Sequence, residues 1–448
     1  MNAETENDHA TDVDPEWMAA LTAKHPHDIA MEIRGLPTPR IRKILRGMAD
    51  EDTAEIIVEL PPHVQVRLLE SMRVSRLSGI IEEMFSDDAA DLLGRIAPER
   101  LQEIMGHLPP AEAREISDLL QYEEDTAGGI MQTEVIAVPE HLTIAETIEK
   151  LRTMEDMTSS DGLFYVYVTD QNERLRGVLR VRDLLFRNPE LRIRDIMIRE
   201  VRAVSVHADQ EEIARIFTRY GFSVVPVVDD FQRLRGIVTS DDVMHILEEE
   251  ATEDMQRMIG LSGEESSGTP WKDSVRKRLP WLYVNLATAF LAGGIVAMFE
   301  STIAQYAVLA VFLPIIAGQG GNAGTQVLTI VVRSLALGDV PEKGQRAILV
   351  KELLVGVLNG LAVGVVVGAI AWMWQESLLL GLVVFAAMLL NMVAAGLSGV
   401  LIPFGLKALR IDPALASAIM LTTVTDVVGF LLFLGFAAAA LTFMPLPL

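Results

Sequence analysis

The chain has 448 residues, 50% of them hydrophobic, and its 38 basic and 62 acidic side chains give a formal net charge of −24. Residues 1–270 have a net charge of −26 and residues 271–448 one of +2. An acidic excess of this size disfavours nucleic acid and anionic lipid surfaces and attracts multivalent cations, and the absence of cysteine excludes disulfides and thiolate metal sites.

The first 23 residues are polar and acidic. They have neither the basic start nor the apolar stretch of a secretory signal. We predict that they form a disordered N-terminus on the cytoplasmic side.

Residues 24–126 repeat with a short period. Turn-like positions recur every twelve residues from Leu36 to Leu108, and helical patterns lie between them. Short helices joined by regular turns stack into solenoids. We therefore predict an all-α helical-repeat superhelix.

A second and longer repeat follows. Residues 129–138 are similar to 195–204, and residues 176–184 are similar to 235–243. Each copy predicts a strand, a helix, two short strands and a helix, and the first copy has seven additional residues, expected around 157–162. The pattern resembles a pair of cystathionine-β-synthase (CBS) domains, α/β modules that usually sense ligands and do no chemistry. The two copies are expected at residues 127–192 and 193–250.

Residues 243–270 connect this pair to the apolar half. Residues 243–258 predict an acidic amphipathic helix, and residues 261–269 predict a Ser/Gly-rich linker. A solvated charged face would explain the acids without any function. The position of the helix between a sensor and a membrane domain favours a mechanical role instead.

Five segments of residues 271–448 are long enough to cross ~30 Å of hydrocarbon, which takes about 20 residues. The first four contain no charged side chain. We predict a multidomain membrane protein with a five-helix transmembrane domain. The predicted spans are 279–299, 301–332, 353–375, 377–406 and 413–441.

Basic residues give the orientation of these spans. They lie before the first span, between the second and third, and between the fourth and fifth, while the other two loops offer only Glu300 and Glu376. Basic loops remain in the cytoplasm. We predict a multi-pass protein of the cell (inner) membrane, with the N-terminal region and the CBS pair cytoplasmic and the C-terminus outside.

The second span contains the run 314–326, which is rich in glycine and begins with Pro314. We expect this run to interrupt the helix, and irregular backbone at this depth is tolerated where protein buries it or water reaches it. Carbonyls at Gly318 and Gly321 and the amide of Asn322 would then accept hydrogen bonds from the waters of a bound ion. No Lys-Ser/Thr pair follows, so the run is not a phosphate loop.

Asp426 is the only charged residue after Pro413. A carboxylate at the middle of a bilayer costs at least ~2.5–3.5 kcal/mol and is usually turned toward a partner or a water-filled path. One interpretation is a buried aspartate satisfied by the hydroxyls of neighbouring threonines. The other, which we favour, is a cation site in a pore.

The order of these parts resembles the MgtE family of magnesium channels over nearly the whole chain. The most specific stretches are 314–326, 250–254, 412–414 and 422–429. The resemblance implies a homodimer whose pore runs along the subunit interface between the second and fifth spans. It implies that Asp426 of both chains binds a hydrated Mg²⁺, and that cytosolic Mg²⁺ bound between acidic surfaces closes the channel.

The resemblance also implies which acids sense Mg²⁺. His245 lies where relatives can carry an acid, which would weaken one sensor site or make it depend on pH. The expected sensor residues are Asp87, Asp91, Asp209, Glu211, Asp242, Glu250, Glu253, Asp254 and Asp412.

A site with one carboxylate per chain suits magnesium, because Mg²⁺ keeps several waters and needs only one or two carboxylates. Mn²⁺, Co²⁺ and Ni²⁺ remain alternative cargo, and ATP or another adenine nucleotide is expected as an added modulator at the CBS pair. Two other classes stay open: a secondary Mg²⁺/Na⁺ exchanger, which inverted repeats would favour, and a membrane-tethered nucleotide sensor. An enzyme is disfavoured, because no nucleophile–base pattern stands out.

Overall fold

The structure is a computed structural model, in which the chain divides into two compact units, Met1–Leu247 and Glu248–Leu448. Each unit is described by itself. The seven additional residues expected near 157–162 lie outside the described residues. The described residues are 15–153, 165–263, 265, 268–338, 340, 344–415 and 417–443.

The helical repeat is confirmed. From α2 to α9 every helix begins twelve residues after the one before it. Five of these helices have a proline in their first turn, where the missing N–H costs nothing. The helices are α2 (Pro26–Ile33), α3 (Thr38–Leu45), α4 (Asp50–Val58), α5 (Pro62–Ser71), α6 (Val74–Glu82), α7 (Ser86–Gly94), α8 (Pro98–Met105) and α9 (Pro110–Leu119).

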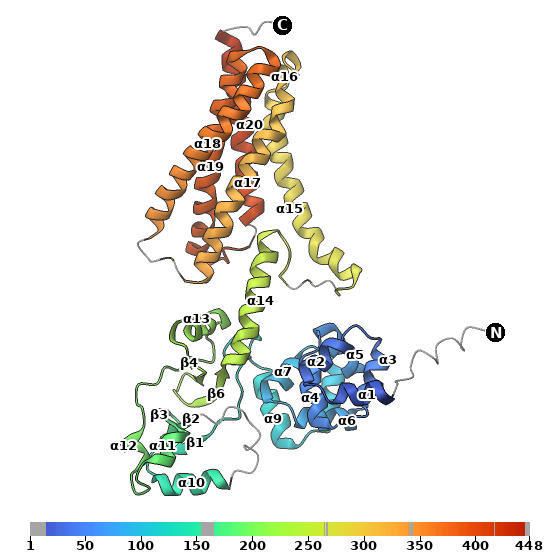
Figure 1. Cartoon of the computed structure of the whole chain (residues 1–448), viewed down its shortest axis with the longest axis vertical. Helices are drawn as coiled ribbons and strands as arrows, with labels where there is room; N and C mark the ends of the chain where they lie inside the picture. The colour runs from blue at the N-terminus through green and yellow to red at the C-terminus, as the bar shows by residue number, and fades with distance from the viewer. Residues whose placement is uncertain are drawn as a thin grey trace, which may run out of the picture. The chain divides into compact units, whose positions relative to one another are not determined.

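Helices two positions apart pack together, as α2 does with α4 and α4 with α6, which gives the superhelix in the blue part of Figure 1. Fully buried aliphatic side chains such as Ile33, Ile57 and Leu69 form its core. One expectation is wrong: part of the N-terminus predicted to be disordered forms α1 (Pro15–Thr22). Leu21 is buried in the same core, and this burial gives the short helix the packing that an isolated helix lacks.

The CBS pair is also confirmed, as two three-stranded sheets in the order β1-β2-β3 and β4-β5-β6. In each sheet the first two strands are parallel and the last two are antiparallel. The strands are β1 (Ala137–Pro139), β2 (Tyr165–Thr169), β3 (Leu175–Arg180), β4 (Val204–Ser205), β5 (Val224–Val228) and β6 (Leu234–Thr239), and the helices among them are α10 (Ile144–Arg152), α11 (Val181–Phe186), α12 (Ile193–Ile196) and α13 (Gln210–Tyr220).

The two copies exchange their first residues. Gln132, from the start of the first copy, pairs with Ile237 in β6 of the second through two backbone hydrogen bonds of 2.8 Å. In return Ile198, from the second copy, pairs with Val178 in β3 of the first. The repeat boundary in the sequence is therefore not the boundary of the packed sheets.

The connecting helix is α14 (Ser240–Met258), which begins three residues before the predicted start. Its first residues, among them buried Val243 and Ile246, belong to the first unit. Its last residues belong to the second unit. One continuous helix therefore carries acidic side chains of both units.

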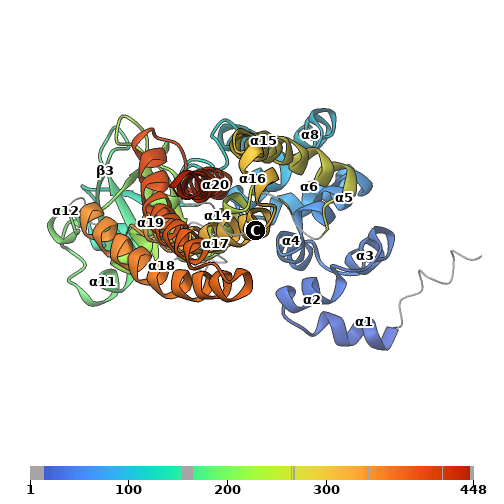
Figure 2. The same ribbon diagram turned by 90° about the horizontal axis from the view of Figure 1, so that it is seen from above.

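The second unit is a bundle of long helices. Within it α19 packs against α17, α18 and α20, and the two views in Figure 1 and Figure 2 agree on this arrangement. The short α16 (Glu300–Gln305) precedes α17. The long helices are α15 (Trp271–Met298), α17 (Leu309–Ala336), α18 (Gln345–Gln375), α19 (Leu378–Ala408) and α20 (Ser417–Phe443).

Four of these helices, α15, α18, α19 and α20, are long and apolar enough to cross a membrane. The second expected span, α17, has 28 residues and therefore the length, but its middle is polar. Close packing of α18 on α19 explains the glycines that recur in α18. A Cβ atom at Gly360 would lie 2.8 Å from the side chain of Leu389, and one at Gly368 would lie 2.8 Å from the carbonyl of Gly381.

The expected break in the second span is wrong, because α17 is a continuous helix that contains Pro314. Backbone polar groups inside a membrane need internal partners, and a continuous helix supplies them despite its glycines. The carbonyl of Gly321 also accepts a hydrogen bond of 2.9 Å from the hydroxyl of Thr325. Gly318 and Gly321 therefore do not present the free carbonyl row that we expected.

Candidate functional site

Asp426 lies half-buried in α20. Among the described residues it has no ion-pair or hydrogen-bond partner. The hydroxyls of Thr422, Thr423 and Thr425 donate to carbonyls of their own helix, at 2.6–3.1 Å, and not to the carboxylate. This geometry removes the interpretation in which threonines satisfy a buried aspartate.

Glycines of α17 bring that helix close to the same part of α20. A Cβ atom at Gly321 would lie 3.8 Å from the side chain of Thr422, and one at Gly324 would lie 2.8 Å from that of Leu421. Thr422 is four residues before Asp426, about one helical turn. The structure therefore places Gly321 one turn from the carboxylate, and it gives no contact between Gly318 or Asn322 and Asp426.

One face of α17 is polar and exposed in the single chain. Asn322 is on this face, so its amide is free to meet solvent, an ion or a second subunit. Exposed neutral oxygens near a membrane carboxylate are unusual unless they line a watery path or an interface. The other exposed polar residues of this helix include Gln319, Thr325, Gln326 and Thr329.

A second group of acids lies where α14 ends. Arg257 binds the carboxylates of Glu253 and Asp412, the latter at 2.5 Å, and the Asp412 carboxylate also accepts the Ala414 N–H at 2.8 Å. Asp412 lies five residues before α20, so this contact joins the connecting helix to the segment that leads into the helix that carries Asp426.

Asp254 completes this group. Burial first, and then the charge of Asp412, raise its pKa to about 6. Burial also raises the pKa of Glu253, to which the charge of Glu250 contributes. The four predicted residues Glu250, Glu253, Asp254 and Asp412 thus influence one another, and Arg257 offsets part of their charge.

Sequence reasoning missed the contacts that hold the linker in place. The side-chain amide of Gln256 donates to the Glu265 carbonyl at 2.7 Å, and its oxygen accepts the Glu265 N–H at 3.0 Å. The Glu265 carboxylate then accepts hydrogen bonds from the Arg278 guanidinium of α15 at 2.5–3.0 Å. The segment that we expected to be a plain linker therefore ties the end of α14 to the first long helix.

The third group lies in the first unit. Asp87 in α7 is buried, and burial together with the charges of Asp88 and Asp242 raises its pKa well above the usual range. Burial and the charges of Asp242 and Asp91 raise the pKa of Asp88 to about 7. Asp242 also accepts the Thr239 N–H at 3.3 Å, so it has a structural role at the start of α14.

The structure brings the predicted residues Asp87, Asp91 and Asp242 together, and the sequence prediction omitted their neighbour Asp88. A run of consecutive aspartates before an apolar helix face was the signal that could have found it. Asp209 caps α13 by accepting the N–H of Glu211 at 2.8 Å. Glu211 also forms an ion pair of 3.5 Å with Arg215 of the same helix.

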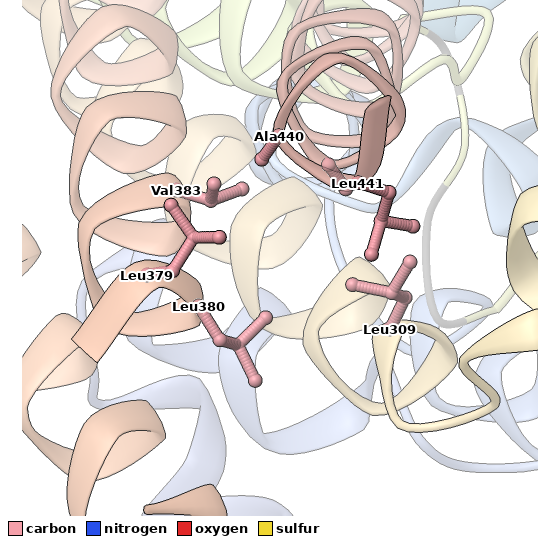
Figure 3. A pocket seen from close by; sticks show the side chains of 7 residues that line it. Leu309, Leu379, Leu380, Val383, Ala440 and Leu441 are labelled. Atoms are coloured by element: carbon pink, nitrogen blue, oxygen red, sulfur yellow. The ribbon is translucent and has the colours of Figure 1, made fainter. Parts of the chain in front are cut away.

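Within the described residues, no group of three or more histidine and acidic side chains is arranged to hold a metal ion. The small hollow in Figure 3 lies between α17, α19 and α20 and is wholly apolar, so it offers nothing to an ion. A single chain thus presents separate carboxylates and no closed metal site in the part that the structure describes. The hollow is lined by Leu309, Leu379, Leu380, Val383, Ala437, Ala440 and Leu441.

Three family models match the chain. The MgtE divalent cation transporter model matches residues 313–436, the MgtE intracellular N domain model matches 24–125, and the CBS domain model matches 127–189 and 193–249.

Curated relatives match over most of their length. The magnesium transporter MgtE of Bacillus subtilis (strain 168) is 30% identical over 95% of this chain and 94% of its own. That of Thermus thermophilus is 35% identical over 92% of each chain. A crystal structure of the cytosolic domain of the Mg²⁺ channel MgtE in complex with ATP is 36% identical, with a TM-score of 0.49, and covers 51% of this chain and 93% of that one.

Proposed function

Because the chain belongs to the MgtE family of magnesium transporters, we propose that it is a Mg²⁺-selective channel for magnesium uptake that cytosolic Mg²⁺ closes. Its membrane unit would conduct the ion. Its acidic cytoplasmic groups would sense it.

The observation that carries the proposal is the Asp426 carboxylate, which lies in a membrane helix without a partner among the described residues. A charge at this depth is costly unless it serves an ion or a proton. Mg²⁺ keeps most of its water and needs few carboxylates, so a single aspartate per chain in a wet, polar passage fits this ion better than a dry cage of many ligands.

Two copies of the chain would form the pore. Asn322 and its polar neighbours on α17 are exposed in one chain, and a two-fold axis beside them would place two such faces and two copies of Asp426 around one path. The cargo waters would then hydrogen-bond to the Asn322 amides. Dimerisation therefore completes the site in this proposal.

Closure would follow from the acidic groups. Within the group near Asp87 and Asp242, and within the group near Asp254 and Asp412, the carboxylates would repel one another when no ion is bound. Burial and, after it, the charges of neighbouring acids raise the pKa of Asp87 and of Asp254. Mg²⁺ would neutralise both groups and favour a compact state. It shifts the equilibrium only through its higher affinity for that state.

Asp209 and Glu211 would act in the same way on a partner surface. His245, three residues after Asp242, supplies no carboxylate and would weaken this sensor site. An adenine nucleotide bound to the CBS pair would modulate the sensor, a role that the ATP complex of the similar cytosolic domain suggests.

The alternative mechanism is a carrier such as a Mg²⁺/Na⁺ exchanger. Carrier sites are typically built from discontinuous helices, whereas α17 is continuous. Currents from single proteins in planar bilayers test the choice. Unitary currents far above carrier turnover would support the channel mechanism. Transport that requires a Na⁺ gradient would support the exchanger mechanism instead.

Flux through the full-length protein in liposomes tests gating, with Mg²⁺ varied on the cytoplasmic side. We expect flux to fall as cytoplasmic Mg²⁺ rises to millimolar levels. Flux that is independent of cytoplasmic Mg²⁺ would remove the sensing part of the proposal and leave the transport part intact.

A further inference from the structure

Asn391 is a buried polar residue that the transport proposal does not use. It lies near the middle of α19 and is 0% exposed. Its side-chain nitrogen donates a hydrogen bond of 2.9 Å to the carbonyl of Ile316 in α17. Its side-chain oxygen is buried and has no hydrogen-bond partner among the described residues.

The amide of Asn391 occupies the space between two glycines on different helices. A Cβ atom at Gly320 of α17 would lie 2.3 Å from the Asn391 nitrogen, and one at Gly429 of α20 would lie 2.9 Å from it. Atoms do not approach that closely, so a side chain at either position would force the Asn391 amide to move. One amide thus sets how near α17 and α20 come to α19.

These contacts lie on either side of Asp426 along α20. Gly429 follows the carboxylate by three residues and touches Asn391, and Thr422 precedes it by four and faces Gly321. Gly320 and Gly321 are consecutive in α17. The part of α20 that carries Asp426 therefore lies against Gly321 of α17 at one end and against Asn391 of α19 at the other, and Asn391 also touches Gly320 of α17.

Packing alone does not explain an asparagine here. Leucine has a similar volume and no polar atoms, and burying an amide with an unpaired oxygen is unfavourable. Hydrogen bonds between membrane helices contribute little stability on average. The residue gains one directional contact, which fixes the rotation of α17 about the Ile316 carbonyl as well as the distance between the helices.

We propose that Asn391 is the positioning residue that sets the spacing between the glycine stretch of α17 and Asp426, and through that spacing the preference for Mg²⁺ over other divalent cations. This inference rests on the proposed role of Asp426 in the ion path. Mg²⁺ demands near-ideal octahedral geometry and gives up its water reluctantly, so a passage that admits the hydrated ion must have a narrowly defined width.

The first test measures uptake of Mg²⁺ and of Mn²⁺ by full-length protein in liposomes. Asn391→Ala and the volume-preserving Asn391→Leu should each lower the ratio of Mg²⁺ to Mn²⁺ uptake by about threefold, the factor that corresponds to an average interhelical hydrogen bond. The matched control is Leu389→Ala, which truncates a side chain of α19 that faces Gly360 of α18. It should slow both ions equally and leave the ratio unchanged.

The second test is steric. Gly320→Ala should impair insertion or transport in the wild-type background, and the defect should be smaller when Asn391→Ala is also present, because the truncated side chain leaves room for the new methyl group. A defect of equal size in both backgrounds would show that Asn391 does not limit the approach of α17.

A third measurement needs no transport. The chain has no cysteine, so Gly321→Cys with Thr422→Cys places the only two thiols on the facing helices. Oxidation should cross-link them more slowly when Asn391 is replaced by leucine. An unchanged rate together with an unchanged ion ratio would overturn the inference.

The two proposals fail separately. If Asp426→Asn transports Mg²⁺ at the wild-type rate, the ion path does not use Asp426 and the proposed function fails first. If Asp426→Asn is inactive while both Asn391 variants keep the wild-type ion ratio, only the positioning role of Asn391 fails.

Discussion

Asp426 shows how a single side chain indicates the purpose of a membrane domain. It is half-buried in an otherwise uncharged helix, and the nearby threonine hydroxyls bond to their own backbone. No described group compensates the cost of its charge, which is at least ~2.5 kcal/mol at mid-bilayer depth. The most economical explanation is that a cation compensates it.

Replacing Asp426 by asparagine or alanine should reduce Mg²⁺ uptake more than about tenfold. Either substitution removes the only charge of α20, and the stabilisation that this charge gives a bound cation exceeds the ~1.4 kcal/mol that corresponds to a factor of ten. Uptake into liposomes, normalised to inserted protein, measures it. Glu376→Gln is the matched control, since Glu376 lies just after α18 and is exposed. Full uptake by well-inserted Asp426→Asn would contradict the pore assignment.

The raised pKa values of two acids in the proposed sensor groups predict a dependence on pH. Burial and neighbouring acids raise the pKa of Asp88 to about 7 and that of Asp254 to about 6. Without divalent cations, the stability contributed by these groups is fully present below their ordinary values near 4 and is lost as pH rises through about 6–7. If these groups bind Mg²⁺ as proposed, protons compete with the ion in this window.

The Mg²⁺ concentration that half-protects the cytoplasmic region from a protease should accordingly be higher at pH 6 than at pH 8, by up to about tenfold per competing proton and pH unit. Asp88→Asn should reduce this pH dependence. An equal midpoint at both pH values would show that neither carboxylate takes part in cation binding.

At the scale of elements, α14 is the part whose contacts say most about gating. Its end is fixed twice: Arg257 binds Asp412 before α20, and Gln256 holds the backbone of Glu265, whose carboxylate binds Arg278 of α15. Hydrogen bonding to Arg278 lowers the pKa of Glu265 to about 2, so this ion pair is present at every physiological pH. A movement of α14 would therefore reach two membrane helices.

Glu265→Ala should loosen the attachment of α14 to α15 while leaving the bundle folded. We expect amide hydrogen exchange in residues 256–263 to become about fivefold faster, the upper range for an ion pair with one exposed partner, which here is Arg278. Asp273→Ala is the control, because it removes an exposed acid from α15, the helix that carries Arg278. Equal exchange in the two variants would mean that the linker contact transmits nothing.

At the scale of the whole molecule, the division of charge suggests that the two halves have different tasks. The acidic first 270 residues contribute carboxylates, and the nearly neutral remainder contributes the apolar helices. Deleting residues 1–126 should therefore leave a protein that conducts Mg²⁺ but needs a higher cytoplasmic Mg²⁺ concentration to close. Flux in liposomes checks this, and complete loss of conduction by an inserted protein would contradict a purely regulatory role.

Millimolar Mg²⁺ should protect the cytoplasmic region from proteolysis, since it neutralises facing carboxylates and favours the compact state. A variant in which the predicted sensor acids are neutral should lose this protection and closure together. If that variant still closes at the wild-type Mg²⁺ concentration, the acids are only a solvated surface. The replaced residues are Asp209, Glu211, Glu250, Glu253 and Asp254.

The sequence by itself determined the architecture, because each part rests on a local pattern. The twelve-residue period predicted helices that begin twelve residues apart, and the internal repeat predicted two copies of a strand, a helix and two further strands. Apolar length predicted five membrane helices, of which four are long and apolar enough to cross a membrane. Asp426 stood out for the same reason, since one charge in a long apolar segment needs no structure to be noticed.

Only the tertiary structure decided what depends on residues that are distant in the chain. It showed that α17 is continuous, that the CBS copies exchange their first residues, and that Asn391 meets glycines of two other helices. It also raised the pKa of Asp88 through burial and through Asp242, which lies far away in the sequence. Periodicity in the sequence predicts which face of an element is buried, but it does not predict what packs against that face. The packing partner determines both the spacing of the helices and the charge state of the carboxylates.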